Sequence, residues 1–167
     1  IPFIEQQSMT ESSDRKTTLA IGADHGGFEL KESLKEHLKA QGIAVQDYGP
    51  TSDEACDYPD FAQAVGRSVA SGQHTLGVLI CKTGIGMSMA ANKIAGVRAA
   101  LVTDAETATM TRTHNDANVL CFGATQTGVE TAKGIVDAFV KGEFEGGRHE
   151  KRVSKLESNL RVEVVDP

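Results

Sequence analysis

Cysteine is scarce in this sequence, with three residues among 167. Three cysteines cannot all pair with one another, and Cys56, Cys81 and Cys121 show no Cys-x-x-Cys spacing. No cluster of cysteine and histidine has the spacing of a zinc site, so we expect neither a metal nor a cofactor. Unpaired cysteines are typical of a reducing compartment, and we therefore expect the protein to be cytoplasmic.

The sequence also lacks an excess of positive charge and any long apolar run. Its 17 Lys and Arg are outnumbered by 23 Asp and Glu, for a net charge of −6. This balance leaves no basic surface for a nucleic-acid backbone. Apolar runs such as 77–80 are far too short to span a bilayer, and residues 1–16 lack the basic start and apolar stretch of a signal peptide. We therefore expect no nucleic-acid partner and no membrane association.

What the sequence contains is an alternation of short apolar runs with amphipathic stretches. Its length and its 40% apolar content fit one domain. We expect a disordered leader or tag over 1–16, a domain over 17–160 and a C-terminal tail over 161–167.

Two patterns predict the secondary structure of this domain. Leu30, Leu34 and Leu38 recur every four residues, as in an amphipathic helix, while 76–81 is apolar on both faces, as in a parallel sheet. We expect strands at 19–23, 43–48, 76–81, 97–102 and 118–122, and helices between and after them, including 87–93 and 150–160. This alternation predicts an α/β fold with a parallel sheet covered on both faces.

Polar residues follow the ends of two predicted strands, where ligands bind in such sheets. Asp24 and His25 follow the first strand, and the run 81–86, Cys-Lys-Thr-Gly-Ile-Gly, begins at the end of the third. Glycine amides leading into a helix favour a phosphate or an enediolate oxygen, and they favour the thiolate form of Cys81. The alternative is a tight strand–helix turn with a buried, inert cysteine. The run is neither a Walker loop nor a dinucleotide-binding fingerprint.

Two further groups lie near the predicted fifth strand and near the C-terminus. His114 can exchange a proton near neutral pH. It is the best acid–base candidate, because His37 lies in an amphipathic helix and His74 in a surface turn; the alternative is a surface or helix-capping histidine. Arg148 and Arg152 are four residues apart and share a helix face, which suits a phosphate. The alternative is a solvated helix face.

Together these motifs resemble the type B ribose-5-phosphate isomerases, a family that also contains isomerases of galactose, allose and tetrose phosphates. The matching segments, in the family's order, are 23–28, 57–59, 80–86, 90–93, 96–99, 114–116, 118–120 and 146–152. The resemblance extends from about Leu19 to Leu156. It implies a Rossmann-like three-layer αβα sandwich with a five-stranded parallel sheet. It also implies a homodimer with shared active sites, in some members paired into tetramers.

The resemblance also assigns catalytic roles. Cys81 matches the base that moves a proton between C2 and C1 of the sugar, and Thr83 matches the hydroxyl that assists this transfer. His114 matches the histidine that opens the sugar ring, with Asp24 nearby. The family needs no metal or cofactor for this chemistry.

The residues that the resemblance assigns to substrate binding have several roles. The backbone of Gly84, Ile85 and Gly86 matches the anion hole for the enediolate. The phosphate-binding residues are His25, Arg112, Arg148 and Arg152, while Asn115 orients the sugar hydroxyls from the partner subunit and Tyr58 lines the pocket.

The resulting prediction is an aldose–ketose isomerase of carbohydrate metabolism that converts ribose 5-phosphate to ribulose 5-phosphate. Lys82 stands where the family usually has glycine, which leaves tetrose 4-phosphate and allose or galactose 6-phosphate open as substrates. Two other classes also fit the residues. One is a thiol hydrolase with Cys81 as nucleophile and His114 as its base, and the other is a phosphate-binding module without catalysis.

Overall fold

The computed structural model describes residues 15–158 of the chain. The predicted leader, apart from its last two residues, and the predicted tail over 161–167 lie outside the described residues. The strands are β1 (Thr18–Ala23), β2 (Ala44–Asp47), β3 (Leu76–Cys81), β4 (Ala99–Leu101) and β5 (Val119–Gly123). The helices are α1 (Phe28–Ala40), α2 (Tyr58–Ala70), α3 (Ile85–Ala91), α4 (Ala105–Thr113), α5 (Val129–Lys141) and α6 (Arg148–Ser158). None of these helices is both long and apolar enough to cross a lipid bilayer.

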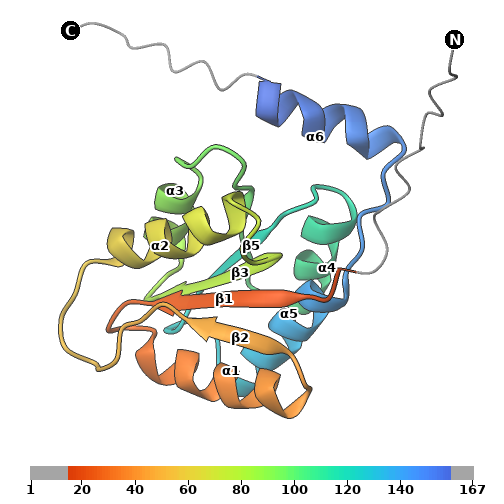
Figure 1. The fold of residues 1–167 in the computed structure, drawn as a ribbon. Helices are drawn as coiled ribbons and strands as arrows, with labels where there is room; N and C mark the ends of the chain where they lie inside the picture. The colour runs from red at the N-terminus through yellow and green to blue at the C-terminus, as the bar shows by residue number, and fades with distance from the viewer. Residues whose placement is uncertain (1–14, 159–167) are drawn as a thin grey trace, which may run out of the picture.

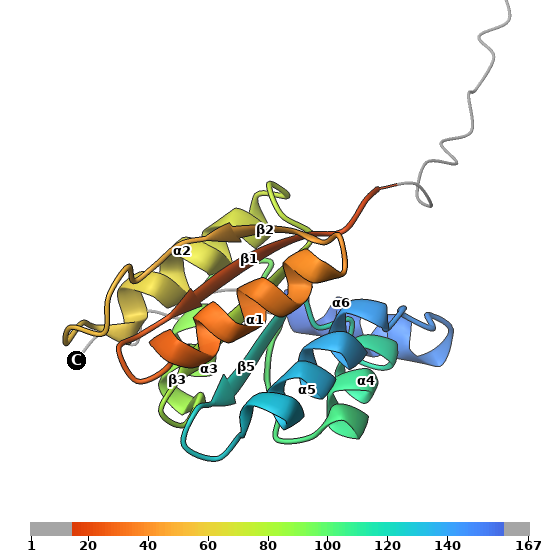
Figure 2. The same ribbon diagram turned by 90° about the horizontal axis from the view of Figure 1, so that it is seen from below.

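The strands form one parallel sheet in the order β2-β1-β3-β5-β4, and helices cover both of its faces. Figure 1 shows α2 and α3 above the sheet with α1 and α5 below it, and Figure 2 shows α4 beside α5 on that lower face. The α6 helix lies outside these layers (Figure 1). The predicted three-layer αβα sandwich with a five-stranded parallel sheet is therefore confirmed.

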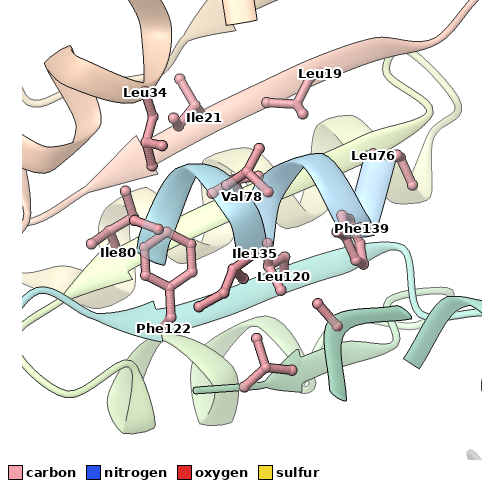
Figure 3. Packing of buried hydrophobic residues seen from close by; sticks show 14 of the residues in the cluster. Leu19, Ile21, Leu34, Leu76, Val78, Ile80, Leu120, Phe122, Ile135 and Phe139 are labelled. Carbon is pink, nitrogen blue, oxygen red and sulfur yellow. The ribbon is translucent and has the colours of Figure 1, made fainter. Parts of the chain in front are cut away.

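Alternating side chains of β1 enter the two halves of the core, because successive residues of a strand point to opposite faces. Leu19 and Ile21 pack toward α1 beside Leu34 (Figure 3), whereas Ala20 joins Val65 of α2 in the other half. All six residues of β3 are buried, as the apolar run predicts for a central strand. Burial on both faces therefore determines where β3 lies, and with it the position of its last residue, Cys81.

Three elements differ from the expected bounds by two residues at one end or both, whereas the other strands agree within one residue. The α3 helix covers Ile85–Ala91 instead of 87–93, because Gly84 takes a left-handed φ of 77° and turns the chain directly into the helix. The β4 strand is only Ala99–Leu101, since it lies at the sheet edge and pairs with β5 alone. The α6 helix begins at Arg148, two residues before the expected start.

The expectation that His74 lies in a surface turn was wrong. His74 is 9% exposed, its Nε2 lies 3.0 Å from Oε1 of Gln46, and its ring contacts the edge of Tyr48 with centroids 5.8 Å apart. Burial lowers the pKa of the imidazole. His74 therefore belongs to the packing around β2.

A buried lysine connects α1 to the segment that follows β2. The Lys31 side chain is fully buried, and its ammonium donates to Asp47 at 2.7 Å, to Glu32 at 2.9 Å and to the Pro50 carbonyl at 2.8 Å. Because every donor meets an oxygen, the buried charge is compensated. This cluster fixes the start of the long segment that leads from β2 to α2.

Candidate active site

Cys81 is the last residue of β3 and lies at the carboxyl edge of the sheet, paired in register with Gly123 of β5. It is 5% exposed, and its sulfur accepts a hydrogen bond from the Gly84 amide at 3.0 Å. A side chain at Gly84 would be strained by its φ of 77°, and its Cβ would lie 2.7 Å from the backbone of Phe122. Glycine is therefore required at the position that directs an N–H toward the sulfur.

Cys81 and Cys121 differ sharply, although both are buried cysteines of the sheet. Cys121 lies within β5 and is fully buried, and burial, with a smaller contribution from Cys81, raises the pKa of its thiol far above the usual value. A thiol that cannot ionise is neither a base nor a nucleophile. Of these two cysteines, only Cys81 ends its strand beside a hydrogen-bond donor.

The rest of the loop after β3 continues the same arrangement. The Thr83 hydroxyl oxygen accepts from the Ile85 amide at 3.3 Å. The Tyr58 ring, at the start of α2, lies against Gly86 so closely that a Cβ there would be 2.5 Å from its Cζ. Tyr58 is 39% exposed, so its ring forms a wall beside the loop that remains open to solvent.

The loop after β1 lies next to that of β3, because the two strands are paired up to Ala23 and Ile80. Asp24 is 7% exposed, and its Oδ1 accepts from the amides of Gly26 at 2.8 Å and Gly27 at 3.2 Å. One carboxylate oxygen of Asp24 therefore organises this loop.

Two further side chains of this edge come from His25 and Lys82. The exposed His25 accepts a hydrogen bond from the Cys56 amide through Nδ1 at 3.3 Å, with the Cys56 sulfur 4.0 Å away. Cys56 thus contacts a predicted site residue and is more than a turn residue. The Lys82 stem packs against Gly26, so this exposed lysine also belongs to the carboxyl edge.

These residues form what we call the carboxyl-edge site. Its members share a position beyond the ends of two neighbouring strands or at the adjoining start of α2: Asp24, His25, Tyr58, Cys81, Thr83, Gly84, Ile85 and Gly86. The structure thus brings together eight of the residues that the sequence predicted. A thiol, a hydroxyl, a carboxylate and an imidazole at one sheet edge can support proton transfer.

His114 lies at the opposite edge of the sheet in the same chain. It follows α4, which starts after the carboxyl end of β4 and runs back to the amino end of β5. Just before β5, the Asn118 carbonyl oxygen accepts a hydrogen bond from the amide of Gly77, which lies at the amino end of β3. Gly77 and Cys81 are four residues apart, or about 13 Å along a strand. Within one chain, His114 therefore does not lie close to Cys81 or to Asp24.

His114 opens onto a pocket of about 360 Å³, lined by His114, Asn115, His149, Arg152, Val153 and Leu156. The rings of His114 and His149 are stacked with centroids 4.5 Å apart and planes 13° from parallel. Burial lowers the pKa of His149, as do the neighbouring His114 and Arg148 to a smaller extent. This amino-edge pocket contains both the His114 imidazole and the Arg152 guanidinium. Arg148 is exposed at the start of α6.

Arg112 faces the interior of its own chain. Its guanidinium donates to Asp116 at 3.2 Å, to the Ala117 carbonyl at 2.5 Å and to the Gly142 carbonyl at 3.4 Å, and it lies over the Phe139 ring. Burial lowers its pKa, against the opposing effect of Asp116. Through these contacts Arg112 holds α4 to the segment after α5.

Glu145 and His149 were not among the predicted site residues. Glu145 lies 3.7 Å from His149, and both lie near His114 although they are more than 30 positions away from it in sequence. Residues this far apart leave no motif. His149 lies in the matching segment 146–152, but no role was assigned to it.

Comparison with known proteins places these features in context. The sequence model of the ribose/galactose isomerase family matches residues 19–156. Ribose-5-phosphate isomerase B of Escherichia coli (strain K12) is 47% identical over 138 residues, which cover 83% of this chain and 93% of that protein. A putative sugar phosphate isomerase of Rickettsia bellii is 41% identical over 139 residues, which cover 83% of this chain and 96% of that protein.

Solved structures of ribose-5-phosphate isomerases B have the same fold as this chain. Ribose-5-phosphate isomerase B of Clostridium thermocellum superposes with a TM-score of 0.84 at 46% identity, covering 85% of this chain and 96% of that one. The enzyme of Mycoplasma genitalium, solved with ribulose 5-phosphate bound, superposes with a TM-score of 0.82 at 44% identity, covering 85% of this chain and 95% of that one.

Proposed function

Because the chain belongs to the ribose/galactose isomerase family, we propose that it interconverts ribose 5-phosphate and ribulose 5-phosphate. The observation that carries this proposal is the Cys81 sulfur at the carboxyl edge of the sheet, which accepts the Gly84 amide at 3.0 Å. It belongs to a chain that is 47% identical to a ribose-5-phosphate isomerase B. The sequence similarity supports the reaction class, and the geometry supports Cys81 as the base.

The proposed reaction moves one carbon-bound proton. The Cys81 thiolate removes the proton from C2 of the open-chain aldose, and the freed electron pair forms the C1–C2 double bond while negative charge moves onto O1. The thiol then returns a proton to C1, and the proton on O2 moves to O1 as C2 becomes the carbonyl. We propose that the Thr83 hydroxyl, which lies in the same loop as Cys81, relays this second proton.

The enediolate needs hydrogen-bond donors fixed in advance. In the proposed site the backbone of Gly84, Ile85 and Gly86 surrounds the thiol and supplies them. Without substrate, the amides of Gly84 and Ile85 donate to Cys81 and Thr83. The enediolate oxygen would therefore replace these acceptors as it forms, and the loop itself would stay in place. The Tyr58 ring lies against Gly86 and is proposed to contact the sugar beside this loop.

We propose that the complete site forms between two copies of the chain. Cys81 and His114 lie at opposite edges of one sheet, so they meet only if the amino-edge pocket of one copy faces the carboxyl-edge site of another. Asn115 and Arg152 line the same pocket as His114. In this arrangement His114 opens the sugar ring and Asn115 orients its hydroxyls, while His25, Arg148 and Arg152 hold the phosphate.

Exposed apolar side chains support an interface of this kind. Ile85 and Met89 of α3, Leu101 of the edge strand β4 and Leu156 of α6 are 46%, 63%, 42% and 58% exposed. An unpaired edge strand beside apolar side chains is a common surface for association. We propose a homodimer, which in some family members pairs further into a tetramer. We also propose a cytoplasmic location, supported by three free cysteines.

A direct assay tests the proposed function. The full chain is incubated separately with ribose 5-phosphate and with erythrose, allose and galactose phosphates, and ketose formation is measured for each. We expect the highest kcat/KM on ribose 5-phosphate. Turnover of only a tetrose or hexose phosphate would reassign the substrate within the family, and Lys82 at the carboxyl edge would then be the first residue to exchange for glycine. No ketose from any of the four would contradict the proposal.

A further inference from the structure

Three potential metal ligands gather at the amino edge, outside the carboxyl-edge site. His114 follows α4, Glu145 lies in the segment before α6, and His149 is the second residue of α6. One ligand atom from each lies within 4.8 Å of the other two. Two imidazoles and one carboxylate are the donor set of three-ligand zinc sites, in which a fourth position stays open.

An independent observation at His149 points to a missing partner. His149 is 7% exposed, and its Nε2 is buried with no hydrogen-bond partner among residues 15–158. A carboxylate oxygen of Glu145 lies 3.7 Å from this nitrogen, which is too far for a hydrogen bond but near enough for both atoms to bind one ion. A buried polar atom without a partner is unfavourable, and a cation between these groups would satisfy it.

We propose that His114, Glu145 and His149 bind a divalent transition-metal ion of the zinc class. Bonds of about 2.0–2.1 Å to each ligand require ligand atoms about 3.4 Å apart in a tetrahedral site. The side chain of Glu145 is 59% exposed and free to swing inward. The two imidazole rings are stacked with planes 13° from parallel. At least one ring must rotate well out of the stack to bind the same ion, because the lone pairs lie in the ring planes.

The surroundings set the expected strength of binding. Arg148 and Arg152 place positive charge nearby and oppose a cation. We therefore expect a dissociation constant on the order of micromolar, tighter for copper and zinc than for manganese.

Occupation of this site has a consequence for the reaction. A metal on His114 takes the lone pair that the imidazole needs for moving a proton between the ring oxygen and the anomeric hydroxyl. The ion would therefore act as a reversible inhibitor. This inhibition rests on the proposed function, whereas binding of the metal does not.

Binding is measured first by calorimetric titration of the metal-stripped full chain with Zn²⁺ in a buffer without phosphate. We expect one ion per chain, and at least tenfold weaker binding in both Glu145→Gln and His149→Asn. Glu143→Gln serves as the matched control, since Glu143 is another exposed glutamate of the same segment. Cys81→Ser tests whether the thiol is the true ligand. Both control variants should bind as the wild type does.

Several results would overturn the site: absence of saturable binding, wild-type affinity in both Glu145→Gln and His149→Asn, or loss of binding in Cys81→Ser. The isomerase assay then tests inhibition. Glu145→Gln should retain normal turnover without metal and should need at least tenfold more Zn²⁺ for half-inhibition. Full turnover at saturating Zn²⁺ would contradict the inhibition. If the protein isomerises no sugar phosphate, the calorimetry still decides the site.

Discussion

The Gly84 amide donates a hydrogen bond to the Cys81 sulfur at 3.0 Å, from a backbone position that only glycine adopts without strain. Gly84→Ala adds left-handed strain and places a Cβ 2.7 Å from the backbone of Phe122. We expect a loss of roughly 2–4 kcal/mol in the free energy of unfolding, with a large loss of turnover, measured by urea denaturation and the ketose assay.

A matched control separates the backbone strain of a positive φ from the steric clash with Phe122. Gly42 has a φ of +74° with nothing within 4 Å of a Cβ, so Gly42→Ala carries the strain alone. It should cost about 1–2 kcal/mol and leave turnover unchanged. Equal stability losses in Gly42→Ala and Gly84→Ala would show that the close approach to Phe122 has no energetic weight.

The Lys31–Asp47 contact predicts a pH-dependent stability difference. Burial alone would raise the pKa of Asp47, but hydrogen bonds from Lys31 and Lys35 outweigh it and hold that pKa below its usual value. The carboxylate therefore contributes stability above its unfolded pKa of about 3.9, and this contribution is lost as pH falls through the lower folded-state pKa. Lys31→Met should unfold roughly 2–4 kcal/mol more easily at pH 7.

The deficit of Lys31→Met should shrink as pH falls below about 4 and through the lower folded-state pKa of Asp47, because protonation of Asp47 in the wild type then removes the ion pair that the variant lacks. Urea denaturation at several pH values measures this difference. Lys133→Met, which breaks an exposed pair with Glu130 at 3.1 Å, should stay within about 0.5 kcal/mol of the wild type. A deficit for Lys31→Met that is constant from pH 7 to pH 3 would contradict the role given to Asp47.

Arg152 lines the same pocket as His114 and is proposed to hold the substrate phosphate. Arg152→Ala should raise KM for ribose 5-phosphate by roughly 10–150-fold, which corresponds to about 1.5–3 kcal/mol for a charge-assisted contact, with a smaller change in kcat. Steady-state kinetics measure this split. Lys151→Ala removes an adjacent exposed charge of α6 and should leave KM near its normal value. An unchanged KM in Arg152→Ala would make this arginine a solvated residue.

Separation of Cys81 and His114 on opposite sheet edges predicts complementation between two inactive variants. Cys81→Ala and His114→Asn should each be nearly inactive on ribose 5-phosphate. After the two are unfolded together and refolded, random dimers should regain roughly a quarter of wild-type turnover, because each mixed dimer has one intact site of two. Separately refolded samples are the control. No recovery, with mixed dimers demonstrated by mass spectrometry, would place both residues' functions within one chain.

The sequence predicted the elements that burial determines. Leu76–Cys81 was predicted to the residue, because a central parallel strand must be apolar on both faces. Edge and turn positions were harder to predict. The shorter β4 depends on its having one neighbour, and the early start of α3 depends on the φ of Gly84.

Side chains whose partners lie far away in sequence could not be predicted from local patterns. His74 was expected in a surface turn, yet it is buried through a contact with Gln46, 28 positions earlier. The proximity of Glu145 and His149 to His114 arises only when α6 folds back beside the end of α4. The carboxyl-edge residues were easier to identify, because parallel strands bring their carboxyl ends to one edge.

Proton transfer at carbon tests the role of Cys81 as the base most directly. Ribose 5-phosphate is incubated in D₂O with the wild type and with Cys81→Ala, and deuterium at C1 of the ribulose 5-phosphate is followed by NMR. We expect ketose formation with deuterium incorporation in the wild type. In Cys81→Ala both should fall at least a hundredfold, while binding of ribose 5-phosphate by calorimetry survives. Isomerisation with deuterium incorporation at the wild-type rate in Cys81→Ala would contradict the assignment of Cys81 as the base.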